Sequence, residues 1–372
     1  MGVGTISAQQ LDRRTLALGA AFLGSLPVNG LPVVLLLRFL MSLDATQAAL
    51  LLGLYTAGNA AGLLLQGRLM ARHGHTVVLV VAAVLHAVTL VAVARGAYVL
   101  VVLAGLTFPE LNTSLRALVR TRTTLSVSTA LFEVASVTGP VVGGWLGDPV
   151  TVLTASALWT VGATAVYVLG IRRLPPPTAG PASGARTPRL VVLYAVPAAC
   201  FSVLAVTAGL VAASAQQSVV VGVLRATLSV GALLGALWVV RRRVRISRPF
   251  VLLVVVSLVA AVSDNLIVLV VCLFVAGTAL TPITVLTTLM VRKENPVATL
   301  ALMQGVAVLA GGVSTAAAGW LFDLGGAEAA FVAAAAIATL GLLVSLWPLA
   351  PDHQPTGEPP GQGKTHSGPV DN

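Results

Sequence analysis

Three ionisable side chains stand inside long apolar stretches of the sequence, where they could carry chemistry: Glu110, Glu133 and Arg225. A charge within a bilayer is costly, so such residues are functional candidates by default. Glu110 follows Pro109, and apolar surroundings favour the neutral form of a carboxyl group, which makes reversible protonation near neutral pH feasible. We expect Glu110 to bind a proton or a cationic compound. The alternative is that its carboxyl satisfies backbone groups freed by the proline.

Uncharged polar side chains form a second group of candidates in the same kind of stretch. They are amides, which can hydrogen-bond to neighbouring helices or to a bound compound. We expect hydrogen bonds between helices, with contact to a bound compound as the alternative, for Asn59, Gln66, Asn112 and Gln304.

The composition decides which solvent surrounds these residues. Hydrophobic residues make up 57% of the chain and charged residues only 9%, and the mean hydropathy is +0.96. Soluble domains carry roughly 25% charged residues, so this chain cannot cover itself with a water-soluble surface. The net charge of +10 is spread singly or in small groups between apolar runs. Anionic lipid headgroups explain that pattern, and nucleic acid is not an expected partner.

The apolar runs have the length of membrane-spanning helices, which need about 20 residues. Hydropathy predicts twelve of them, and the ninth is the weakest because it is short and only Ser263-Asp264-Asn265 separates it from the tenth. The predicted spans are 15–38, 46–67, 76–94, 98–119, 124–146, 150–171, 190–212, 217–240, 249–262, 266–291, 299–318 and 327–348.

The spans divide into two halves. Residues 1–171 form an N-terminal six-helix half and residues 190–348 a C-terminal one. Residues 172–189 are rich in proline and also contain glycine and serine, which predicts a cytoplasmic linker. The polar, proline- and glycine-rich tail at 349–372 is expected to be a disordered cytoplasmic segment.

The charges between the spans predict the orientation. Acidic residues gather on one side of the layout, at Asp44, Asp148, Asp264, Asp323 and Glu328. Basic residues gather on the other side, and the positive-inside rule makes that side and both termini cytoplasmic. The basic set is Arg13, Arg14, Arg68, Arg72, Arg116, Arg120, Arg122, Arg172, Arg173, Arg186, Arg189, Arg241, Arg242, Arg243, Arg245, Arg248, Arg292 and Lys293.

Internal repeats support the division into halves. Gly53 and Gly62 recur 169 residues on as Gly222 and Gly231, and Pro109 precedes Arg120 by the same eleven residues that separate Pro282 from Lys293. Gly-Trp-Leu-Gly-Asp at 144–148 reappears as Gly-Trp-Leu-Phe-Asp at 319–323. Together these matches indicate a duplicated six-helix unit.

Two motifs resemble signatures of the major facilitator superfamily. The loop after the second span contains Gly67, Arg68, Arg72 and Gly74, although Ala71 replaces the acid usual in that signature. The fifth span contains Gly139, Pro140, Gly143 and Gly144, which is similar to the end of the motif of drug exporters. The resemblance implies an all-α membrane protein with two pseudo-symmetric six-helix bundles. It also implies a central cavity lined by the first, fourth, seventh and tenth helices, with gating by the two motifs.

In that family the fifth and eighth helices pack across the two halves, which bears on Glu133 and Arg225. With a rise of ~1.5 Å per residue, the two side chains differ by about 9 Å in depth. We expect an ion pair between the halves that favours one conformation. Satisfaction of each charge within its own half is the alternative.

These features predict a multi-pass protein of the bacterial cytoplasmic (inner) membrane, with lipid, a small-molecule substrate and protons as partners. The expected function is proton-coupled export of a small hydrophobic or cationic organic compound by alternating access. Uptake, or a membrane sensor that has lost coupled transport, are the alternatives, and Ala71 favours the sensor. No Walker loop, catalytic cluster or metal-ligand spacing stands out, so no cofactor, metal or enzymatic activity is expected, and the protein is expected to be a monomer.

Overall fold

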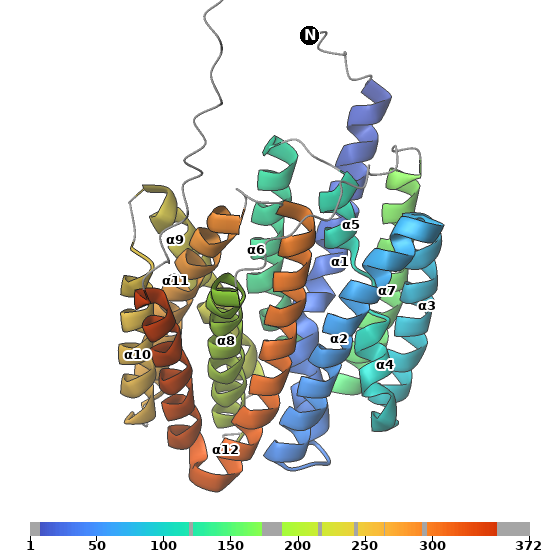
Figure 1. Ribbon diagram of the computed structural model, residues 1–372. Helices are drawn as coiled ribbons and strands as arrows, with labels where there is room; N and C mark the ends of the chain where they lie inside the picture. The colour runs from blue at the N-terminus through green and yellow to red at the C-terminus, as the bar shows by residue number, and fades with distance from the viewer. Residues whose placement is uncertain are drawn as a thin grey trace, which may run out of the picture.

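The apolar runs fold into helices that run up and down a single bundle, because a helix satisfies its own backbone hydrogen bonds in hydrocarbon (Figure 1). The computed structural model describes residues 8–118, 122–172, 188–214, 218–241, 245–263, 265–291 and 296–347, and all regular structure among them is helical. Helices α3 and α7 lie on one flank of the bundle, and α10 and α11 lie on the other.

The helices of the first half follow the predicted spans within several residues, except in the fourth. They are α1 (Ala8–Leu40), α2 (Ala45–His73), α3 (His75–Ala94), the 3₁₀ turn η1 (Tyr98–Leu100), α4 (Val101–Leu106), α5 (Leu111–Leu118), α6 (Arg122–Trp145) and α7 (Pro149–Ile171).

The predicted fourth span, 98–119, is not one continuous helix. Helix α4 ends at Leu106, and α5 begins only at Leu111. Pro109 explains the interruption, because it lacks an N–H group, its ring clashes with the carbonyl four residues earlier, and it disfavours helical backbone at Phe108.

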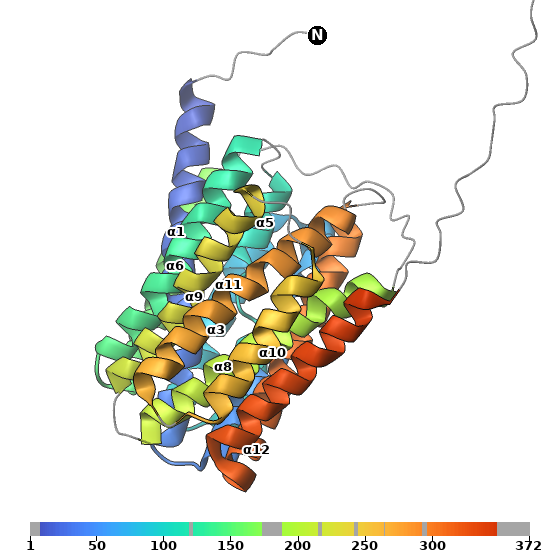
Figure 2. The same cartoon turned by 90° about the vertical axis from the view of Figure 1, so that its left-hand side faces the viewer.

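The second half contains α8 (Pro188–Ser214), α9 (Ser218–Arg241), α10 (Ser247–Ala261), α11 (Leu266–Val291) and α12 (Pro296–Leu346). Figure 2 shows these helices from the side on which α9, α10 and α11 face the viewer. Helix α12 is two helices joined at a kink, where Gly325 and Gly326 leave helical backbone and Gly326 has a φ of 67°. The two parts correspond to the predicted eleventh and twelfth spans, and the first part extends beyond the predicted 299–318 at both ends.

The outer surface of the bundle matches a membrane environment. Eight helices among the described residues are long and apolar enough to cross a bilayer, and α10 is a shorter apolar helix. Large apolar side chains on α3 and α7 are exposed, among them Val88 and Leu158.

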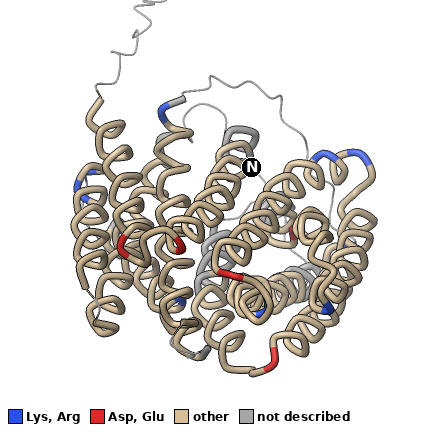
Figure 3. Tube along the Cα trace, turned by 90° about the horizontal axis from the view of Figure 1, so that it is seen from below, with Lys and Arg blue, Asp and Glu red and all other residues tan. Residues whose placement is uncertain are grey.

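Few described residues are charged, as Figure 3 shows from the end that carries the α1–α2 turn and the α12 kink. We call this end the predicted outer end. The chain is a multi-pass membrane protein, and the number of twelve crossings stays a prediction.

Glycines bring helices together at equivalent places in the two halves. A Cβ atom on Gly105 of α4 would collide with the backbone of Tyr55 and Asn59 in α2. A Cβ atom on Gly277 of α11 would collide with the backbone of Leu228 and Ala232 in α9. These two crossings are related by an offset of 172 to 173 residues, obtained as 277 − 105 and 228 − 55.

The same offset corrects the predicted register of the repeat. Gly62 packs against Leu106 as Gly235 packs against Thr278, so the partner of Gly62 is Gly235 and not Gly231. Pro109 and Pro282 lie 173 residues apart, in agreement with this register. The predicted offset of 169 is therefore one helical turn short.

Candidate functional site

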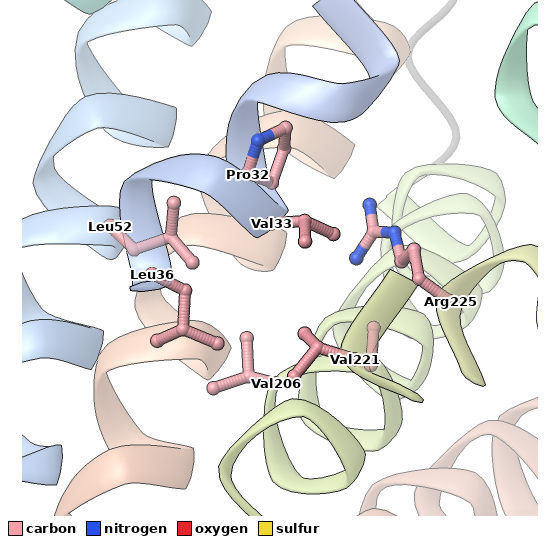
Figure 4. A pocket seen from close by; sticks show the side chains of 8 residues that line it. Pro32, Val33, Leu36, Leu52, Val206, Val221 and Arg225 are labelled. Carbon is pink, nitrogen blue, oxygen red and sulfur yellow. The ribbon is translucent and has the colours of Figure 1, made fainter. Parts of the chain in front are cut away.

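A small pocket lies between the two halves of the bundle (Figure 4). Its free volume of about 10 Å³ is close to the minimum that holds one water molecule. We call it the central pocket. Its lining comes from α1, α2, α8 and α9. The described residues of the fourth and tenth spans, which were expected to line the cavity, do not contribute to it. The lining residues are Pro32, Val33, Leu36, Leu52, Ala205, Val206, Val221 and Arg225.

Arg225 supplies the one charged group in this lining. It lies seven residues into α9, so roughly 10 Å along the helix from Ser218 at ~1.5 Å per residue. Its guanidinium carbon lies 4.5 Å from the ring centroid of Phe201 in α8, which is a cation–π contact. The guanidinium makes no hydrogen bond or ion pair with any side chain in the described part of the chain.

The predicted pair of Arg225 with Glu133 stays a prediction. Glu133 lies in α6, but its side chain is outside the described residues. The helices themselves do meet across the halves, because Gly222 of α9 packs directly against the carbonyl group of Pro140 in α6. The expected contact between the fifth and eighth spans is therefore confirmed.

The break between α4 and α5 contains Glu110 and is bridged by Gln66 of α2. In a continuous helix the Glu110 N–H would donate to the Leu106 carbonyl. Here the Gln66 amide stands between these two groups: its Nε2 donates to the Leu106 carbonyl at 3.1 Å, and its Oε1 accepts from the Glu110 N–H at 3.4 Å. Gln66 Nε2 also donates to the Phe108 carbonyl at 2.7 Å. Gln66 thus performs the interhelical role expected of it.

This bridge takes over part of the backbone pairing that the alternative interpretation assigns to Glu110. The alternative interpretation of Glu110 is that its carboxyl group pairs with backbone groups freed by Pro109. Gln66 already pairs with two backbone carbonyls at the break, those of Leu106 and Phe108. Glu110 itself is half-buried.

We expect Gln66→Leu to destabilise the first half. Leucine has a similar volume but no amide, so the carbonyls of Leu106 and Phe108 lose a donor, at about 1–3 kcal/mol for each unsatisfied group. The free energy of unfolding, measured in mixed micelles with increasing SDS, should fall accordingly. The loss should be smaller in a Pro109→Ala background, where a continuous helix can satisfy its own backbone. An equal loss in both backgrounds would contradict the bridging role.

The Gly-Pro motif of α6 lies at crossings with both α1 and α9. A Cβ on Gly139 would collide with the backbone of Leu26 and Gly30 in α1, and a Cβ on Gly143 would touch Val34. Gly144 is buried in the same helix. Next to this crossing, Asn29 accepts a hydrogen bond from the Ser136 hydroxyl at 3.1 Å and donates to the Ser25 carbonyl at 2.8 Å. The motif therefore positions α6 between the two halves.

A second set of contacts joins the halves at the predicted outer end. Gly53 of α2 packs against Gly312 and Ala316 of α12, and Gly319 packs against Ala49. The Asp323 carboxylate of α12 accepts a hydrogen bond of 2.8 Å from the Thr46 N–H in the first turn of α2. An anion at a helix N-terminus is stabilised by the unpaired N–H groups and the helix dipole. This hydrogen bond therefore connects Asp323 of α12 to the start of α2.

Asp323→Ala should loosen this end of the molecule. Loss of a capping carboxylate costs about 0.5–2 kcal/mol, which shifts a two-state equilibrium by roughly 2- to 30-fold toward conformations in which α2 and α12 separate. Spin labels on cysteines placed at the exposed positions Met41 and Leu324 report the distance across this end. The matched control is Glu328→Ala, which removes an exposed acid on the same helix. Identical distance distributions in Asp323→Ala and wild type would rule out this connection.

The predicted signature loop is the end of α2 and a one-residue turn. Gly74 has a φ of 83° and its N–H donates to the Met70 carbonyl at 3.0 Å, so α3 can begin at His75. Gly74 therefore makes the tight turn between the two helices. A Cβ added to Gly67 would have nothing within 4 Å, so that glycine does not serve close packing in this conformation. Arg68 and Arg72 are exposed.

The remaining predicted residues lie apart from the central pocket. Asn59 of α2 is half-buried and contributes backbone to the crossing with Gly105. Asn112 lies in α5 and is half-buried, and Gln304 lies in α12 and is exposed. Their side chains form no hydrogen bond with the described residues. No group of three histidine, cysteine or acidic residues in the described ranges could hold a metal ion.

The architecture is that of the major facilitator fold, which is shared with solved transporters. A crystal structure of an autoinhibited POT family peptide transporter matches with a TM-score of 0.69 and 13% identity, over 92% of this chain and 99% of that chain. A crystal structure of the nucleoside transporter NupG matches with a TM-score of 0.66 and 13% identity, over 90% and 98%. A peptide transporter POT in complex with sulfate matches with a TM-score of 0.67 and 13% identity, over 93% and 94%.

These likenesses show the fold, since the identities are too low to carry more. No protein-family model matches the sequence, and no curated protein matches it. What the chain does must therefore be argued from its own residues.

Proposed function

We propose that the protein is a secondary active transporter that moves a small organic compound across the bacterial cytoplasmic membrane by alternating access. The observation that carries the proposal is the central pocket, which lies between the halves and holds a membrane-embedded cation, Arg225. The pocket has room for about one water molecule, so a substrate enters only when the halves move apart. Midplane sites between tilting halves are typical of this mode of transport.

We further propose that transport runs in the direction of export and is coupled to protons through Glu110, with both termini in the cytoplasm. The half-buried position of Glu110 at a helix break supports the coupling role, because unwound backbone in membrane proteins occurs where it is buried in protein or lines a cavity. The Gly-Pro motif in α6 supports export. Uptake by the same mechanism is the competing direction.

Counterflow in proteoliposomes tests the transport proposal. Purified protein is reconstituted, and radiolabelled benzoate, benzamide and tetraphenylphosphonium are each exchanged against an internal pool of the same compound, with and without a pH gradient. We expect at least one compound to exchange faster than in protein-free liposomes and a pH gradient to drive its accumulation. A chain that exchanges none of the three differently from empty liposomes would support the sensor alternative.

A further inference from the structure

Arg225 is a charge without a counter-charge among the described residues. It lies within a membrane-spanning helix and faces the central pocket, where the other lining residues are aliphatic or proline (Figure 4). Intramembrane arginines normally pair with an acid or with backbone carbonyls. Arg225 instead meets the ring of Phe201 at 4.5 Å, and its guanidinium has no described acceptor. The guanidinium charge of Arg225 is therefore partly screened by the Phe201 ring, and its N–H groups can still bind a ligand.

Arginine has a geometry that suits a particular kind of ligand. Its planar guanidinium presents five N–H donors in a fork that binds a carboxylate through two parallel hydrogen bonds. The ring of Phe201 lies 4.5 Å from the guanidinium carbon and offers no oxygen or nitrogen acceptor, so the N–H donors remain for another molecule. Around it, Val33, Leu36, Val206 and Val221 offer only apolar surface.

We propose that the central pocket binds a small organic monoanion, a carboxylate on an apolar body, and that Arg225 is its charge partner. This proposal rests on the proposed transport function and specifies its substrate class. The carboxylate accepts hydrogen bonds from the N–H groups of Arg225. The apolar body of the ligand packs against the aliphatic side chains that α1 and α8 contribute to the pocket. Phe201 packs against the guanidinium from α8 and so helps to hold it at the pocket.

The same observations weigh against other substrate charges. A cationic compound would meet Arg225 in surroundings of low dielectric constant, where like charges repel strongly. A phosphate dianion would need a second cation or several N–H donors, and the lining residues other than Arg225 supply neither. A single guanidinium neutralises a single negative charge, so a monocarboxylate fits the pocket best.

Ligand-induced stabilisation of the purified protein tests this assignment. Hexanoate, benzoate and 2-naphthoate at pH 8 are compared with their amides and amines, and phenyl phosphate serves as the dianion. The shift in thermal midpoint measures binding, because a ligand that binds only the folded state raises the midpoint. We expect at least one carboxylate to bind at least tenfold more tightly than its amide and amine. Stronger binding of an amine, an amide or phenyl phosphate, or no binding by any carboxylate, would overturn the proposal.

Variants separate a binding role of Arg225 from a structural one. Arg225→Gln should lower carboxylate affinity at least about 30-fold, since truncating one partner of a buried charge pair typically costs that much. Arg225→Lys should weaken binding by about two- to tenfold, because it keeps the charge but loses the fork. Arg248→Gln, the same change at an exposed position of α10, is the matched control and should leave affinity unchanged.

Two further outcomes keep this test distinct from the transport proposal. If Arg225→Gln does not fold, the folded Arg225→Lys variant and Phe201→Leu decide instead, and carboxylate affinities equal to wild type in both would overturn the assignment. If the wild type exchanges benzamide or tetraphenylphosphonium faster than empty liposomes and Arg225→Gln does so at the same rate, the substrate class is wrong while the transport function stands.

Discussion

Gly105→Ala and Gly277→Ala are each expected to destabilise the protein by about 1–3 kcal/mol, because overpacking a tight contact costs that much. Each glycine lies where two helices touch through their backbones. An added Cβ on Gly105 would collide with the Tyr55 carbonyl, and one on Gly277 with the Leu228 carbonyl. Backbone atoms in a helix cannot move aside as a flexible side chain can, so the helices must separate. SDS unfolding of the purified protein measures the loss.

A matched control separates crowding from the change of residue type. Gly162 lies in α7, and a Cβ added there would have nothing within 4 Å. Gly162→Ala should therefore be neutral or stabilise by up to about 1 kcal/mol, the difference in helix propensity. The double variant Gly105→Ala/Gly277→Ala should show the sum of the two single effects, because the sites lie in separate halves. Wild-type stability of both single variants would contradict the close crossings and the 173-residue repeat.

Most of the fold could be predicted from hydropathy, for a physical reason. Hydrocarbon admits few irregular segments, so apolar runs and helices coincide. The predicted tenth span, 266–291, has the same bounds as α11. The register of the repeat was harder to predict from the sequence. Two registers that differ by four residues place the same glycines on the same helix face. Contacts such as that of Gly62 with Leu106 were needed to choose between them.

The break in the fourth span could not be predicted from the sequence around it. Pro109 and Pro282 occupy equivalent positions, yet only α4 and α5 are interrupted, while α11 continues through Pro282. The difference lies in another helix. Gln66 offers its amide to the interrupted backbone, and the residue 173 positions after Gln66 is Val239, which has no amide to offer. A break is stable only where such a partner exists, and the partner is 40 residues or more away in the chain.

The candidate site could be predicted in part. Arg225 stands out in the sequence because it is an ionisable residue in an apolar run. Phe201 gives no such signal, since aromatic residues are ordinary in these runs, and its contact with Arg225 depends on how α8 packs against α9. The sequence predicts only that Asp323 marks the outer side, and its bond to Thr46, 277 residues distant in sequence, needs the folded arrangement of the halves.

Glu110→Gln should abolish the coupling of transport to protons while leaving exchange intact. Glutamine keeps the size and hydrogen-bonding capacity of the side chain but cannot take up and release a proton. One pH unit corresponds to about 1.4 kcal/mol, which for one coupled proton supports a roughly tenfold substrate gradient. In proteoliposomes with the membrane potential clamped, the wild type should reach that ratio, and the variant should stay near unity with counterflow preserved. Glu328→Gln, an exposed acid on α12, should behave as wild type. A tenfold gradient in Glu110→Gln would assign the proton to another residue, and loss of counterflow as well would place Glu110 in substrate binding instead of coupling.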